Sequence, residues 1–260
     1  PVVHEFFGIF CETARLLGER VAAVHRALAS IPDDPDFTPE PLTPLYQRSW
    51  YQSLRNQMAR VGFALADHMH TLPVEVQAAA QRLLEKSEQI LQLTQRSVSE
   101  TITGMRIRCH GDLHLGRVLH TGRDLVIIGF QGDPSRSPLE ARVKRTPLRD
   151  VASMLRSFGF AVDRMLYGPA RTVRPEDVAR LEPWARLWER WVGAAFLRAY
   201  LQAMEGSGLV PTEPRALECL LTFCLVERSV IALGQEIEHR PDHVAIPIRG
   251  LLEWLESNGC

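Results

Sequence analysis

Cysteine is scarce in this chain of 260 residues. The five cysteines stand at irregular spacings, and no two of them form a C-x-x-C pair: Cys11, Cys109, Cys219, Cys224 and Cys260. An odd number without regular spacing argues against a disulfide framework. The sequence therefore predicts free thiols in a reducing compartment, which for this chain would be the cytoplasm.

Long apolar runs and an excess of basic residues are also missing. No run approaches the roughly 20 apolar residues that span a bilayer, so no membrane segment is expected. The opening PVVHEFFGIF has neither the charged nor the long apolar region of a signal peptide. Residue 1 is not methionine, so we expect the chain to begin inside a longer polypeptide. A net charge of −1 and a pI of about 6.9 argue against general binding of nucleic acid.

The length suits one large domain or two small ones. Apolar residues make up 45% of the chain and charged residues 23%, which allows a substantial core in a soluble protein. Apolar residues at helical spacing predict helices over 14–30, 45–69, 74–102, 146–166, 174–204, 211–241 and 246–257. Five prolines between residues 31 and 44 predict a loop there. We find no repeat and no linker. The organisation expected is a helical part over 1–103, a loop and hairpin region over 104–134 and a second helical part over 135–260.

The helical pattern stops at the segment RCHGDLHLGRVLHTGRDLVIIGF. Here RVLH and LVII predict two short strands joined by a turn that contains Gly122. The HGD sequence places Asp112 on a glycine-kinked turn before them. A carboxylate in such a loop can orient a hydroxyl and take its proton during phosphoryl transfer. Without further evidence, a carboxylate that only caps the loop is the simpler interpretation of Asp112.

The sequence resembles the maltokinase family, and in particular the kinase-like domain that is often fused to trehalose synthase. The similarity runs in family order from about residue 10 to 256, through LGERVAAVHRALAS, PDFTPEPLTPLYQRSWYQSLRN, RIRCHGDLHLGRVL, LVIIGFQGDPSRSPLEARVKRTPLRDVASMLRSF, LEPWARLWERWVGAAFLRAYL and HRPDHVAIPIRGLLEWLE. The resemblance implies a mostly helical α+β fold, the C-lobe of the aminoglycoside-phosphotransferase variant of the protein-kinase fold. It also implies phosphorylation of maltose by ATP, with Mg²⁺, to maltose 1-phosphate.

The family's site residues carry over position by position. Asp112 would be the catalytic base, supported by His110, His114 and Asp150. The family's metal-side Gln is Arg117 here, its principal Mg²⁺ ligand Asp is Gly129, and the Glu that follows is Gln131. Glycine has no ligand to offer, and a guanidinium has no lone pair for a cation. The resemblance thus implies a maltokinase-like domain whose Mg²⁺-dependent activity is impaired.

Other departures concern the nucleotide and the sugar. No glycine-rich phosphate motif occurs, and nothing before residue 104 indicates a sheet, so we expect the N-lobe to be absent. Glu227 and Glu236 occupy family sugar-site positions, but Ile231 and Gln235 stand where tyrosines are common.

Several alternatives stay open on the sequence alone. Arg117 could contact a phosphate directly, or Asp124 or Asp133 could bind metal from a shifted position. The chain could instead be a non-catalytic scaffold or a glucan-binding module associated with trehalose synthase. At the level of single residues, His110 and His114 could be metal ligands or structural, and Asp150 could favour a helix start or hold the loop backbone.

One cluster of basic residues and one of tryptophans each allow two interpretations. The basic residues Arg142, Lys144, Arg145 and Arg149 could meet a phosphate or an acidic partner, or form a solvated face. The tryptophans Trp184, Trp188 and Trp191 follow helical spacing, which indicates core packing more often than sugar stacking.

Overall fold

The computed structural model describes residues 2–31, 34–97, 102–131, 140, 142–168 and 171–258. These residues fold into two compact units that are interleaved along the chain. The first unit comprises residues 1–42, 103–162 and 173–217, and the second comprises 43–102, 163–172 and 218–260. The expectation of a single lobe over residues 1–260 stays a prediction.

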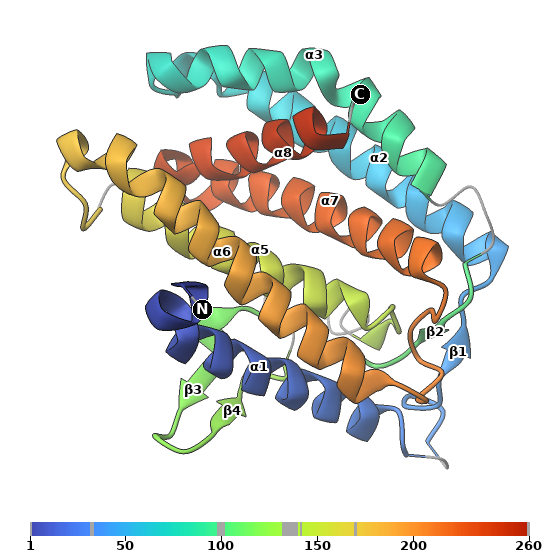
Figure 1. The fold of residues 1–260 in the computed structure, drawn as a ribbon. Helices are drawn as coiled ribbons and strands as arrows, with labels where there is room; N and C mark the ends of the chain where they lie inside the picture. The colour runs from blue at the N-terminus through green and yellow to red at the C-terminus, as the bar shows by residue number, and fades with distance from the viewer. Residues whose placement is uncertain are drawn as a thin grey trace. The chain divides into compact units, whose positions relative to one another are not determined.

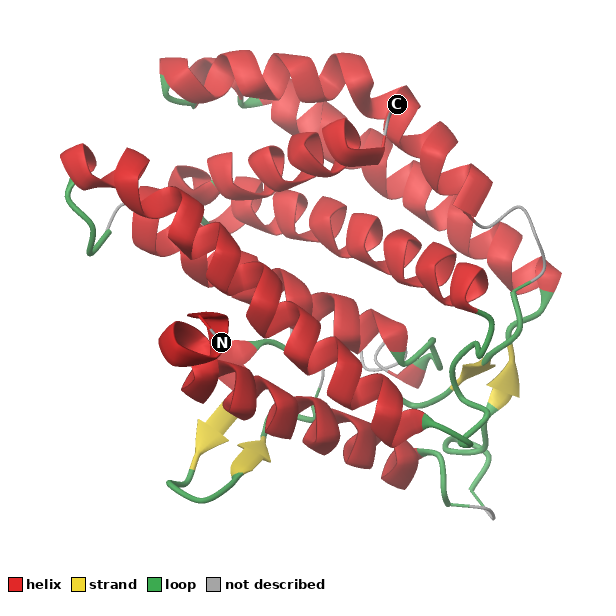
Figure 2. Cartoon of the chain, viewed as in Figure 1, coloured by secondary structure: helices red, strands yellow, loops and turns green. Residues whose placement is uncertain are grey.

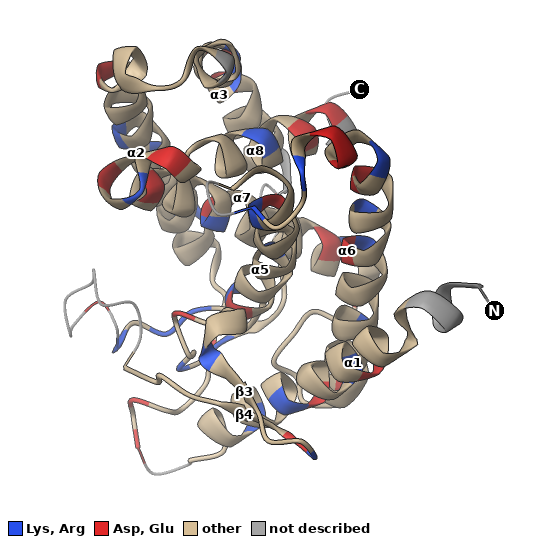
Figure 3. Ribbon diagram, turned by 90° about the vertical axis from the view of Figure 1, so that its left-hand side faces the viewer, with Lys and Arg blue, Asp and Glu red and all other residues tan. Residues whose placement is uncertain are grey.

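In the first unit, helix α1 (Val2–Leu28) packs along helix α6 (Pro175–Met204) (Figure 1). The sequence favours α6 where it begins, since Pro175 occupies the first turn and Glu176 and Asp177 follow at the positive end of the helix. Acidic and basic residues are interspersed along α6 (Figure 3), and some of them form ion pairs within the helix. The first unit also holds most of α5 (Leu148–Tyr167) and the start of α7 (Pro214–His239).

Two short antiparallel pairs lie in the same unit (Figure 2). Strand β3 (Val118–His120) pairs with β4 (Leu125–Ile127) as the predicted hairpin, and Gly122 in its turn has a φ of 86°. The second pair joins β1 (Glu40–Pro41) to β2 (Met105–Arg106). This pair was not expected, because residues 31–44 were predicted as loop. Two residues leave no alternating pattern, and their partners are 64 to 66 positions away.

The second unit is helical and contains α2 (Pro44–Asp67), α3 (Val74–Ser97), most of α7 and α8 (Ala245–Asn258). The described residues of this unit also include the single-turn 3₁₀ helices η1 (Met69–Thr71) and η3 (Pro241–His243). Thr43 caps α2 by accepting a hydrogen bond from the Tyr46 amide, and Pro44 follows at the first helical position. The predicted third helix was extended to residue 102, but Ile102 is not helical.

No helix among the described residues has both the length and the apolar content to cross a membrane.

Candidate functional site

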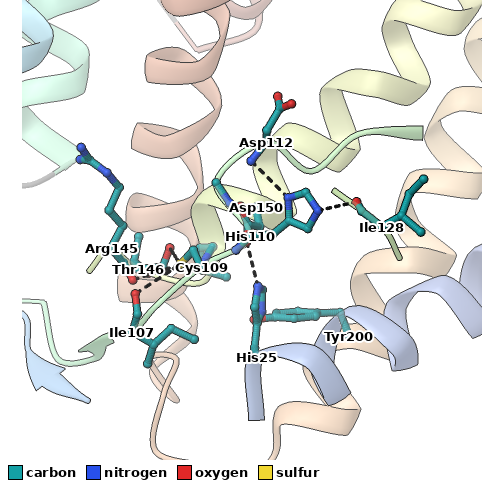
Figure 4. Close-up of polar contacts among 12 residues, drawn as sticks. His25, Ile107, Cys109, His110, Asp112, Ile128, Arg145, Thr146, Asp150 and Tyr200 are labelled. Carbon is teal, nitrogen blue, oxygen red and sulfur yellow. Dashed lines mark hydrogen bonds and ion pairs between the residues drawn. The ribbon is translucent and has the colours of Figure 1, made fainter. Parts of the chain in front are cut away.

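The segment that carries Asp112 is anchored at its base to the residues that lead into α5. Ile107 and Arg145 exchange two backbone hydrogen bonds of 2.9 Å. The Cys109 thiol lies close to the carbonyls of Ile107, Arg145 and Thr146 (Figure 4). Burial raises the pKa of this thiol well above its ordinary value, so Cys109 stays protonated near neutral pH and is a structural residue.

Asp150, in the first turn of α5, fixes the backbone of the loop by hydrogen bonds. Its carboxylate accepts hydrogen bonds from the amides of His110 (2.7 Å) and Gly111 (3.0 Å). Ser157, two turns further along α5, accepts the Leu115 amide at 3.2 Å. One helix thus supports the loop on both sides of Asp112. Both sequence readings of Asp150, a helix start and a loop support, fit these contacts, and its part in catalysis stays a prediction.

His110 ties the loop to the hairpin. Its Nδ1 accepts the Asp112 amide at 3.3 Å, so its Nε2 carries the proton and donates to the Ile128 carbonyl at 2.9 Å (Figure 4). The ring of Phe130 lies 4.9 Å from the His110 ring. Both ring nitrogens are used within the protein, which favours the structural reading of His110 over the metal-ligand reading.

Asp112 points its carboxylate away from this network (Figure 4), and its side chain is 17% exposed. Its Oδ2 accepts a hydrogen bond of 2.8 Å from Nη2 of Arg117. Arg117 belongs to the 3₁₀ helix η2 (Leu115–Arg117). His114 begins that helix by accepting the Gly116 amide on Nδ1, which leaves its Nε2 3.8 Å from Asp112 Oδ2. The structure therefore brings three of the predicted site residues together: Asp112, His114 and Arg117.

Gly129 faces the same arginine. A Cβ placed on Gly129 would meet Cδ, Nη1 and Nε of Arg117 at 2.9 to 3.1 Å. Gly129 has a φ of 87°, a backbone conformation that residues with a side chain rarely adopt. The Arg117 side chain thus fills the space into which a side chain at position 129 would project. Arg117 and Gly129, the two departures from the maltokinase pattern, therefore complement each other in space.

A Mg²⁺ ion does not fit these residues. Mg²⁺ prefers hard oxygen ligands, and position 129 offers none, while the Arg117 guanidinium places a permanent positive charge beside Asp112. The described part of the chain contains no group of three or more His, Cys, Asp or Glu residues that could hold a metal ion. Gln131 is exposed.

The two carboxylates considered as replacement ligands give different outcomes. Asp124 lies in the hairpin turn, where its two oxygens accept from Nε and Nη2 of Arg20 at 2.8 and 3.1 Å. This bidentate pair links the hairpin to α1, and the hydrogen bond from Arg20 lowers the Asp124 pKa. Asp124 would have to give up both contacts before it could bind a metal. Asp133 lies outside the described residues.

The predicted sugar-site acids, Glu227 and Glu236, are both buried in the second unit. Glu227 accepts a 2.8 Å hydrogen bond from the Trp50 indole, whose ring lies 4.4 Å from that of Phe223. Glu236 pairs with Arg240 at 2.6 Å. Both acids thus have structural partners, and their role in sugar binding stays a prediction.

The basic cluster is not a solvated face, which corrects that reading of the sequence. Lys144 and Arg149 are buried, while Arg142 is exposed. Lys144 donates to Glu40 at 2.7 Å and to the Pro35 carbonyl, and Arg106 donates to the second oxygen of Glu40 at 2.6 Å. The partners that make burial of the Lys144 charge possible come from a distant segment. A local run of basic residues therefore does not reveal that Lys144 is buried.

Replacing Glu40 by glutamine should lower stability near pH 7 by about 1 kcal/mol, since Glu40 is itself partly exposed. The hydrogen bond from Lys144 lowers the Glu40 pKa. Its ion pairs therefore stabilise the fold above the unfolded-state pKa of about 4.3, and this contribution is lost as the pH falls through the lower folded-state pKa. Urea unfolding of both proteins from pH 7 to 3 should show the difference shrinking with acid. A difference that is constant over this range would contradict the assignment.

The three tryptophans divide between the two readings. Trp188 packs edge-on against Phe10 and Phe158, as the core reading predicts. Trp184 and Trp191 are 52% and 45% exposed. Core packing therefore describes only one of the three.

Sequence reasoning missed three residues that support the loop: His25, Tyr200 and Ser157. His25 contacts Asp150, and Tyr200 contacts His25 (Figure 4). His25 stands on the buried face of α1 with Leu17 and Val21. A histidine in register with an apolar stripe was the one local signal that could have drawn attention to it.

No protein-family model matches this sequence. A glucosamine kinase of Mycolicibacterium smegmatis is 42% identical over 74 residues, an alignment that covers 28% of this chain and 18% of that protein. A solved structure of glucosamine kinase, crystal form B, matches with a TM-score of 0.73 and 21% identity. Glucosamine kinase in complex with glucosamine, ADP and inorganic phosphate matches with a TM-score of 0.71 and 21% identity.

Each of these structural matches covers 94% of this chain and 54% of the other. The chain thus spans about half the length of the solved relatives that it resembles. Similarity at this level of identity establishes the fold. The chain has a predominantly helical α+β fold like the C-lobe of kinase-like enzymes, which confirms the fold class expected from the sequence.

Proposed function

We propose that this chain is the helical lobe of a sugar-kinase-like phosphotransferase in which an arginine has replaced the metal side of the site. The resemblance to maltokinases supplies the finer assignment: maltose as acceptor, ATP as donor and maltose 1-phosphate as product. Trehalose synthase is its fused or associated partner in this proposal. The observation that carries the proposal is the 2.8 Å contact between Asp112 and Arg117 on a loop held by α5.

In this proposal Asp112 acts on the acceptor. It would accept a hydrogen bond from the anomeric hydroxyl and take its proton as the hydroxyl oxygen bonds to the γ-phosphorus of ATP. The bond from that phosphorus to the bridging oxygen would break in the same step, and ADP would leave with the electron pair. Asp150, Ser157 and His110 would hold the loop so that this carboxylate keeps one orientation. Arg117 opposes the reaction in the ground state, because it occupies Oδ2 of Asp112, the oxygen for which a sugar hydroxyl would compete.

The first test is ADP release with maltose, and separately with glucosamine, using the longest natural chain that contains these residues. Kinases of this general kind turn over at about 1–100 s⁻¹. We expect a rate on maltose at least about 1,000-fold lower, because the metal position is filled by a guanidinium. We expect Asp112→Asn to abolish the remaining turnover.

The control is Asp36→Asn, which makes the same chemical change at an exposed aspartate and should leave the rate unchanged. A rate in the ordinary kinase range would contradict the loss of the metal side. Residual turnover that survives Asp112→Asn would contradict the role of Asp112 as base.

A second candidate function is a glucan-binding module, and the exposed tryptophans of α6 favour it. Trp184 and Trp191 are seven residues apart, which places them on one face of the helix about 10.5 Å apart. Flat indole faces are suited to stacking on the apolar faces of glucose rings. A folded protein that releases no ADP with either sugar but cosediments with glycogen would favour this second function.

A further inference from the structure

Asp150 has a hydrogen-bond partner besides the loop amides, and that partner comes from a segment far away in the sequence. Nε2 of His25, near the end of α1, lies 3.2 Å from Asp150 Oδ2. Nδ1 of the same ring lies 3.0 Å from the Tyr200 hydroxyl on α6. His25 and Tyr200 are fully buried and Asp150 is 1% exposed. A buried histidine that hydrogen-bonds a buried carboxylate 125 positions away in the sequence is more than a packing residue.

The directions of the hydrogen bonds follow from the chemistry of the three groups. Burial raises the pKa of Asp150, but the hydrogen bonds that its carboxylate accepts from His25 and from the Gly111 amide outweigh burial, so the net shift is downward. The carboxylate is therefore ionised and accepts only, and His25 Nε2 must donate to it. Burial raises the pKa of Tyr200 well above its ordinary value, so its hydroxyl keeps the proton and can donate to His25 Nδ1.

We propose that His25 and Tyr200 are positioning residues for the loop that carries Asp112. A directed chain of hydrogen bonds runs from the Tyr200 hydroxyl through the His25 ring to Asp150 (Figure 4). From Asp150 it continues to the amides of His110 and Gly111. Tyr200 fixes the tautomer of His25, His25 fixes the rotation of the Asp150 carboxylate, and that carboxylate fixes the two amides that precede Asp112. Neither His25 nor Tyr200 contacts Asp112.

His25 can affect the loop because it shares an acceptor with it, one oxygen of the Asp150 carboxylate. Asp150 Oδ2 accepts from both His25 and the His110 amide, while Oδ1 accepts from the Gly111 amide. Without the donor on His25, a buried carboxylate loses one of its three partners, and an unsatisfied buried charge is costly. The carboxylate would turn toward other donors, and the two loop amides would lose their acceptor. The loop would loosen even if the helices stayed packed.

The test compares two variants of His25 whose side-chain amide groups mimic different nitrogens of the imidazole ring. His25→Gln keeps a donor near the place of Nε2 and can still reach Asp150. His25→Asn is shorter, keeps a group near the place of Nδ1 and cannot reach Asp150. Residue-resolved hydrogen exchange of the full chain, followed by NMR, measures how well the amides of His110 and Gly111 are protected.

We expect His25→Asn to speed exchange of both amides at least tenfold, His25→Gln to stay within about threefold of the unmodified chain, and Tyr200→Phe to fall between them. Val21→Ala is the matched control, since it removes buried apolar volume from the same face of α1. It should lower global stability and change the exchange of the His110 and Gly111 amides only in step with the amides of α5. The proposal is overturned if His25→Gln and His25→Asn act alike, or if both amides follow global stability in every variant.

The catalytic part of this inference rests on the proposed function, but the exchange measurement does not. If the chain turns over maltose, His25→Asn should lower kcat with little change in KM, and His25→Gln should restore kcat. If the chain has no turnover, the exchange pattern still decides whether His25 positions the loop. Failure of the two ideas is therefore seen in different experiments.

Discussion

Replacing Arg117 by glutamine and Gly129 by aspartate together should raise the affinity of the site for a divalent cation at least about 100-fold. The double change removes a positive charge beside Asp112 and adds a carboxylate in the space that the arginine side chain occupies. Two unit charges 4 Å apart interact by about 4 kcal/mol at an effective dielectric constant of about 20. A 100-fold change corresponds to about 2.8 kcal/mol, which is within what the charges can supply. Mn²⁺ binding followed by electron paramagnetic resonance measures it directly.

The single variants are the controls for this prediction. Gly129→Asp alone should gain little, because its Cβ would meet Arg117 at 2.9 Å and its carboxylate would pair with that guanidinium. It should also cost about 1–2 kcal/mol of stability, because position 129 has a positive φ. Arg117→Gln alone removes the charge but supplies no carboxylate at position 129. If the double variant binds Mn²⁺ no better than the stronger single variant, Arg117 and Gly129 are not the main obstacle to metal binding.

Gly18→Ala should destabilise the chain by about 2–4 kcal/mol, because it forces α1 away from α6. A Cβ on Gly18 would collide with the Phe196 carbonyl and lie 2.9 Å from the Tyr200 nitrogen and 3.2 Å from the Ala199 Cβ. Two of these neighbours are helix backbone, so a side-chain movement cannot relieve the contact. His25 lies two turns further along α1, so the same displacement would also disturb its contact with Tyr200. Urea unfolding at constant pH gives the loss of stability.

Gly250→Ala is the control for this prediction and should have the opposite sign. Gly250 lies inside α8, and a Cβ there meets nothing within 4 Å. Alanine is favoured over glycine in a helix interior by about 0.5–1 kcal/mol, so this variant should be more stable. If Gly18→Ala were as stable as the unmodified chain, the close approach of α1 and α6 would be wrong.

The resemblance located Asp112, Arg117 and Gly129 by position in the sequence, but it could not say how their side chains meet. Three-dimensional packing shows that the arginine fills the space beside the glycine and pairs with the aspartate. The burial of Lys144 was likewise hidden, because its partner Glu40 is 104 residues away. Charge and exposure are properties of the surroundings, and a local run of residues does not contain them.

By itself, the sequence determined the hairpin and most of the helices, because both depend on local periodicity and on turn residues such as Gly122. The start of α1 was missed, since the helix was predicted from residue 14 and begins at Val2. The mostly helical character follows from that periodicity, whereas the kinase-like C-lobe was implied by the resemblance to the maltokinase family. Only the tertiary structure decided the pairing of β1 with β2, the exposure of Trp184 and Trp191, and the buried chain from Tyr200 to the loop. Each of these depends on contacts between distant segments, whose free energy is realised only when the chain is folded.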